Sequence, residues 1–191
     1  MLNNFDEYLS YLELLGASEY NHISGPMINH LTGTYNILSS WGAPLLTCKA
    51  GLFHAIYGPQ GLPSPLISLE KRLDIKNFIG HDVEELVYFY CACDKSFVLP
   101  QFKATSEIIF KDRFTGEEKQ FDKNLMTSFC ELTVANEIDV ARGTRVEVYS
   151  DAILDMLKSM YTHINKNAQR ELDSIFKIAA DVNSFCPLPL S

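Results

Sequence analysis

The stretch CKAGLFHAIYG, residues 48–58, is small and apolar and contains a single histidine, His54. This pattern predicts a buried helix over about 44–57. The residues Gly42-Ala43-Pro44 end an earlier helix, which is predicted to run from Pro26 to about Trp41, and open the next one. The join is short, so we expect the two helices to pack antiparallel against each other.

Helical spacing of apolar residues also covers most of the remaining chain. The segment SEIIFKDRFTGEEKQFD, residues 106–122, differs, because a Thr115-Gly116 turn separates the apolar EIIF from a polar second arm. That pattern is typical of a β-hairpin. Further helices are predicted at 4–16, 68–78, 81–93, 123–141, 150–164 and 167–180.

We therefore predict an all-α fold with a small β-hairpin insert near 106–122. No linker or internal repeat divides the 191 residues, which favours one domain over 1–191. Its core is expected at about 20–142 and its C-terminal helices at 146–181. In helical folds of this kind, sites are built from side chains on facing helices.

Composition excludes several classes of function. Hydrophobic residues make up 47% of the chain and the net charge is −8, which disfavours nucleic acid and anionic membranes as partners. No signal peptide or membrane span is evident. The five cysteines include no CxxC pair, so we expect reduced thiols in a cytoplasmic protein.

The histidines and one later helix carry the candidate chemistry. His30 and His54 are 24 residues apart, a spacing that lets them meet across two antiparallel helices. The segment LTVANEIDVA, residues 132–141, adds Asn136 and Asp139 to one face of a third helix. An asparagine in the middle of a helix is intrinsically disfavoured, so a buried Asn136 should have a specific hydrogen-bond partner.

The order of three segments resembles the HD-domain superfamily, and most closely the hydrolase domain of the stringent-response alarmone enzymes. The segments are NHISGPMINHLTGTYNILSSWGAPLLTCKAGLFHA, NFIGHDVEELVYFY and TVANEIDVA, spanning roughly residues 20–142. The resemblance implies an HD-like helical bundle. It also implies a site in which two histidines and two aspartates hold one divalent metal ion.

Compared position by position with those enzymes, this sequence keeps the metal-binding histidines but not the acidic residues. The metal-binding histidines fall on His30 and His54, whereas the aspartates fall on Ala55 and Asn136. Two further acids that assist hydrolysis fall on residues 58–59, a glycine and a proline. Two imidazoles and an amide give a divalent cation no charge compensation, so phosphohydrolysis of the parent kind is not expected.

Other side chains offer replacement ligands. His22 precedes His30 across a predicted loop and would complete a three-histidine site, while Asp139 would give two histidines and a carboxylate. Iron, manganese or zinc would suit such sets. A metal-free site is the alternative.

We therefore expect an enzyme acting on a small molecule, with altered or absent metal. Its catalytic candidates are His30, His54, Tyr57 and Asn136. Tyr57 follows His54 by three residues on the predicted helix and would donate to that imidazole or to a substrate oxygen. Proton transfer, elimination, cyclisation or oxygenation would fit. The alternative is an inactive HD-like module that binds a small ligand or a partner protein, with both histidines reduced to buried core residues.

Overall fold

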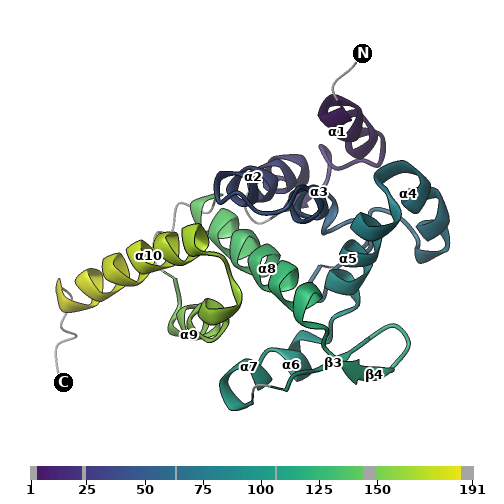
Figure 1. Cartoon of the computed structure of the whole chain (residues 1–191). Coiled ribbons are helices and arrows are strands. Elements are labelled where there is room, and N and C mark those ends of the chain that lie inside the picture. Colours follow the sequence, from purple (N-terminus) through teal and green to yellow (C-terminus); the bar gives the residue numbers. More distant parts are fainter. Residues whose placement is uncertain (1–3, 23–24, 63, 106, 144–148, 186–191) are drawn as a thin grey trace.

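The computed structural model describes residues 4–22, 25–62, 64–105, 107–143 and 149–185 (Figure 1). Within them the chain is mostly helical with two very small antiparallel sheets, which confirms the predicted helical class. The helices are α1 (Asn4–Leu14), α2 (Met27–Ser40), α3 (Leu45–Phe53), α4 (Arg72–Ile79), α5 (His81–Ala92), α6 (Lys95–Val98), α7 (Gln101–Ala104), α8 (Lys123–Gly143), α9 (Asp151–Met160) and α10 (Lys166–Phe185).

The centre of the molecule is a packed group of four helices. Helix α2 packs on α3 and α8, and α3 also packs on α5 (Figure 1). Their facing side chains form one continuous apolar core, in which Leu31, Leu52 and Leu132 are fully buried. Helices α1 and α4 lie at one end of this group, and α9 and α10 at the other. Because α2, α3 and α8 meet in the core, polar side chains on their facing surfaces are removed from water.

Helix α3 begins and ends at residues that fix its position. Pro44 precedes its first turn, as predicted, and the preceding glycine, Gly42, has a φ of 69°. The helix ends at Phe53, four residues earlier than predicted, because residues 54–57 tighten into turns that lead to Gly58, also at φ 69°. A Cβ atom at Gly58 would lie 3.2 Å from the backbone of Pro65, a tight contact, and the positive φ itself favours glycine there. This early end determines where the side chains after His54 point.

The predicted hairpin is confirmed. Strands β3 (Ile109–Lys111) and β4 (Glu118–Gln120) pair antiparallel, with Phe110 opposite Lys119. The ring of Phe110 is buried and stacks on Phe89 of α5 at 3.7 Å between centroids. The outer strand β4 is fully exposed.

Several elements differ from the prediction at their boundaries. The predicted helix at 68–78 begins as a 3₁₀ turn, Leu69–Lys71, and the one at 150–164 ends as another, Tyr161–His163. The single-turn helices α6 and α7 and the paired residues β1 (Asn21–His22) and β2 (Gly25–Pro26) were not predicted, because segments so short have no measurable periodicity. The expected start of the C-terminal part at 146 lies outside the described residues.

None of the helices in the described ranges is long and apolar enough to cross a lipid bilayer.

Candidate functional site

His30 and His54 meet in the core, as their spacing predicts. His30 lies in the first turn of α2, and His54 is the residue that caps the end of α3. Their Nε2 atoms are 3.2 Å apart. Both residues are buried, with only 3% of His30 and 1% of His54 exposed to solvent. Two ring nitrogens this close and away from water must have either a hydrogen on one of them or a cation between them.

Helix α8 supplies two more members of this site. Asn136 Oδ1 lies 3.1 Å from His30 Nε2, on the same nitrogen that faces His54. Asp139, one turn further along, places Oδ2 2.7 Å from the other ring nitrogen, Nδ1. We call His30, His54, Asn136 and Asp139 the paired-histidine cluster. Asp139 thus contacts the outer nitrogen of His30, and does not reach the space between the imidazoles where a third ligand would lie.

The tautomer of His54 follows from its partners. Its Nδ1 lies 2.8 Å from the carbonyl oxygen of Gly51, an obligate acceptor, so Nδ1 carries a hydrogen. Burial, followed by the field of His30, lowers the pKa of His54 to about 3, and the ring is neutral near pH 7. Its Nε2 is therefore a bare lone pair aimed at His30.

The close approach of α2 and α8 depends on Gly33. A Cβ atom at this position would lie 1.8 Å from Asp139 Oδ1. Any other residue would push the carboxylate away from its position on His30. The glycine of HLTGTY is therefore part of the construction of the cluster, which the sequence alone did not reveal.

Tyr57 does not join the cluster. The helix α3 ends at Phe53, before Tyr57, and the Tyr57 hydroxyl donates to Glu84 Oε1 at 2.9 Å. The expected contact with His54 is not made. Arg72 donates to both oxygens of the same carboxylate through two nitrogens, at 2.7 and 3.0 Å. Tyr57, Arg72 and Glu84 form a separate group, the Glu84 cluster, and Glu84 is completely buried.

The other histidines stand apart from the cluster. The backbone of His22 lies in β1, but its side chain is outside what the structure describes. His81 is 69% exposed at the start of α5, where its neighbour Asp82 occupies the first turn, in keeping with a helix-start role for this HD dipeptide. Cys48, Cys91, Cys93 and Cys130 are buried free thiols, as expected, and Cys186 is not among the described residues.

Sequence reasoning missed a second layer around His54. The Tyr90 ring lies edge-on to the His54 ring, with centroids 5.4 Å apart, and its hydroxyl is 3.5 Å from Lys95 Nζ. The Cys91 thiol donates to the backbone carbonyl of His54 at 3.0 Å. Burial raises the pKa of Cys91 to about 12, so this thiol keeps its hydrogen. No sequence signal pointed to Lys95, because the helix that carries it was not predicted.

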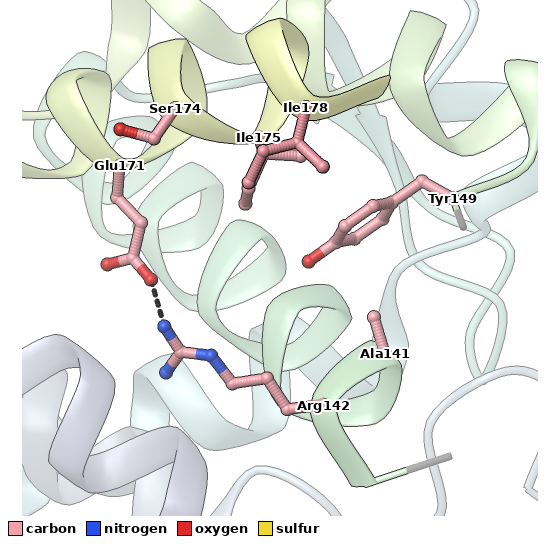
Figure 2. Close-up of a pocket in the computed structure, with 7 residues that line it drawn as sticks. All are labelled: Ala141, Arg142, Tyr149, Glu171, Ser174, Ile175 and Ile178. Carbon is pink, nitrogen blue, oxygen red and sulfur yellow. Dashed lines mark hydrogen bonds and ion pairs between the residues drawn. The ribbon is translucent and has the colours of Figure 1, made fainter. Parts of the chain in front are cut away.

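A surface pocket of about 300 Å³ lies beyond the cluster, between the end of α8 and α10 (Figure 2). Tyr149 points its hydroxyl toward the middle of the pocket, and Arg142 pairs with Glu171 across one side. Burial raises the pKa of Tyr149 to about 12. The pocket holds no member of the paired-histidine cluster.

A family model described as a domain of unknown function, DUF6817, matches residues 11–95. That range contains His30 and His54 but ends before Asn136 and Asp139. No curated protein matches the chain.

Proposed function

We propose that the protein is a small-molecule enzyme in which His30 transfers a proton and the other members of its cluster control where that proton lies. One observation carries the proposal: two buried imidazoles face each other through their Nε2 atoms at 3.2 Å, while each is fixed from behind by an acceptor. The reaction class is a proton transfer on a small substrate, or an elimination or cyclisation that depends on one.

The hydrogen-bond partners favour a specific arrangement of protons. His54 presents a lone pair, so His30 must donate from Nε2, a hydrogen that also faces Asn136 Oδ1. Nδ1 of His30 then either donates to the Asp139 carboxylate or accepts from its acid form. Either way, His30 and Asp139 hold one mobile proton between them, the pairing that orients a histidine for acid–base catalysis.

Asn136 is the group that a substrate would displace. It is only half-buried, and its amide nitrogen donates to Glu137 Oε1 at 3.2 Å on the side away from His30. Moving this amide would open Nε2 of His30 to a substrate while His54 keeps the ring in register. The apolar walls around the cluster would exclude water from that step.

The resemblance to HD-domain hydrolases raises the question of a metal ion. Two zinc–nitrogen bonds at a near-tetrahedral angle would place the nitrogens about 3.4 Å apart, so the separation alone admits an ion. The donor set does not fit well. The inner donors are two neutral imidazoles and a neutral amide, and no group of three His, Cys, Asp or Glu side chains in the described ranges is arranged to hold a metal. We therefore assign a hydrogen on His30 Nε2, and no metal ion, to the space between the imidazoles.

Metal content and turnover test this proposal together. Protein purified without a histidine tag should contain well under one divalent ion per chain by mass spectrometry of the elements. Incubated with a fractionated metabolite extract, it should convert at least one small molecule, and His30→Gln should abolish the conversion. His81→Gln, which removes an exposed histidine, is the matched control and should be fully active. Stoichiometric metal, or conversion by His30→Gln, would overturn the proposal.

A second candidate function is that of a non-catalytic HD-like module, in which the cluster only stabilises the packing of α2, α3 and α8. The near-complete burial of both imidazoles favours it. In that case His30→Gln would lower the stability of the protein, and neither the wild type nor the variant would convert any metabolite.

A further inference from the structure

A pocket of about 480 Å³ lies between α6–α7 and α9, with α8 behind it. Its volume is within the range of about 300–1,000 Å³ typical of small-molecule sites. Most of its wall is apolar, and its charged members come from three different helices. The lining residues are Lys95, Leu99, Pro100, Lys103, Glu137, Ala152, Ile153, Met156 and Ser159.

Lys95 is the unusual group in this pocket. Its side chain is half-buried, and its ammonium contacts Tyr90, 3.5 Å from the hydroxyl and 4.9 Å from the ring centroid. It forms no ion pair with any carboxylate of the described residues, whereas Lys103 at the rim pairs with Asp155 at 3.0 Å. An ammonium carries three donors, so most of the hydrogen-bonding capacity of Lys95 is open to an occupant of the pocket.

The charge of Lys95 is retained despite its surroundings. Burial lowers its pKa, but the nearby Tyr90 hydroxyl and Glu137 carboxylate outweigh this effect and hold the pKa above its ordinary value. A half-buried ammonium attracts an anion more strongly than an exposed one, because less water screens it.

The inner end of the pocket adjoins the paired-histidine cluster by two routes. Tyr90, which contacts Lys95, is edge-on to His54. Glu137, on the pocket wall, accepts from the amide of Asn136. A molecule bound at Lys95 would therefore place its head one side chain, Tyr90, away from His54, and two side chains, Glu137 and Asn136, away from His30.

We propose that this pocket binds a small amphiphilic monocarboxylate, with its carboxylate on Lys95 and its apolar chain against Leu99, Ile153 and Met156. Glu137, which lines the pocket and whose charge acts on Lys95, disfavours a second negative charge on the head. The apolar wall excludes a purely polar anion as the preferred occupant. The statement that this occupant is the substrate rests on the proposed function, whereas its binding does not.

Calorimetric titration with octanoate tests the assignment, with octanamide as the neutral analogue of equal chain length and acetate as the head alone. Octanoate should bind at least about tenfold more tightly than either, the difference expected for a charge-assisted hydrogen bond. Lys95→Met, which keeps the length of the stem, should remove this advantage. Lys95→Arg should retain it.

Lys103→Met is the matched control, because the charge it removes lines the same pocket but is already paired. It should change octanoate affinity by no more than about twofold. Equal binding of octanoate and octanamide, or full octanoate affinity in Lys95→Met, would overturn the assignment.

His54→Gln separates this inference from the proposed function. Octanoate should bind to the folded His54→Gln variant as it does to the wild type. If the wild type converts a metabolite but fails to bind octanoate, the ligand class is wrong and the proposed function stands. If octanoate binds at Lys95 but the wild type converts no metabolite, the proposed function is wrong and the pocket assignment stands.

Discussion

Two buried polar clusters adjoin the end of α3, and they differ in how completely their polar groups are paired. In the Glu84 cluster a fully buried carboxylate meets the guanidinium of Arg72 and the hydroxyl of Tyr57, with Lys76 Nζ 3.6 Å away. Every charge there has an opposite charge. In the paired-histidine cluster the lone pair of His54 Nε2 and the amide oxygen of Asn136 both face His30 Nε2, so one hydrogen on that nitrogen must serve two acceptors.

The difference separates a structural role from a chemical one. A fully paired cluster such as that of Glu84 holds α4 and α5 together and has nothing left to offer a ligand. In a cluster where several acceptors face a single hydrogen, that hydrogen is positioned for transfer to a substrate. The two clusters are joined by only the short turn 54–57, so the same stretch of chain serves both.

The largest expected effect is on the Glu84 side. Arg72→Met should lower the free energy of unfolding by about 3 kcal/mol, because it leaves a buried carboxylate without its main counter-charge. Chemical denaturation measures this loss. Lys71→Met is the control, since it removes an exposed pairing with Asp74 and should cost well under 1 kcal/mol. A loss below 1 kcal/mol for Arg72→Met would remove the contrast between the clusters.

On the histidine side, acid should act through His54. Its pKa is lowered to about 3 in the folded protein from 6.5, so the unfolded chain binds more protons between these values. This contribution to stability is therefore complete above pH 6.5 and is lost as the pH falls. At pH 5 the loss is about 2 kcal/mol.

Chemical denaturation at pH 7.5 and pH 5 measures that loss. The free energy of unfolding should fall less on acidification in His54→Gln than in the wild type, while His81→Gln should follow the wild type. An identical pH dependence in all three proteins would contradict the assignment of His54 as a buried neutral ring.

Restoring an acid should turn the proton site into a metal site. Asn136→Asp places a carboxylate beside both imidazoles, and zinc affinity should rise at least tenfold, equivalent to about 1.4 kcal/mol. Asn29→Asp adds the same charge at an exposed position of α2 and is the control. Equal zinc affinity in the two variants would mean that the inner face of the cluster does not reach a common ion.

The smallest effect tests the helix contact beneath the cluster. Gly33→Ala should destabilise the protein by about 1 kcal/mol, because the clash of its Cβ with Asp139 outweighs the gain in helix propensity. In an Asp139→Ala background the same change should be neutral or stabilising. Additive losses in this double-mutant cycle would show that Gly33 and Asp139 do not touch.

The meeting of the histidines could be predicted from the sequence for a physical reason. Two strongly apolar helices joined by the short Gly42-Ala43-Pro44 turn are expected to pack antiparallel, which brings the start of one helix, with His30, close to the end of the other, with His54. The helical period alone then placed Asn136 and Asp139 on one face of α8. The helical class and the hairpin followed from equally regular patterns.

The sequence did not reveal features that depend on where a single helical turn ends or on a partner far away in the chain. Tyr57 was assigned to the face of His54 because nothing in HAIYG marks the end of α3 before Gly58. Glu84, next to Glu85 at the start of a helix, has the sequence pattern of a solvated acid. Its burial depends on Arg72, on a different helix. Lys95 lies in a segment too short to show a period.

The most direct test of the central claim is a long-range proton–nitrogen NMR spectrum of the histidine rings at pH 7.5, assigned with His30→Gln and His54→Gln. We predict that His54 carries its hydrogen on Nδ1 and a bare lone pair on Nε2, and that His30 carries a hydrogen on Nε2. If His54 carries its hydrogen on Nε2, or if His30 has no hydrogen there, His30 is not the donor across this contact and the account is wrong.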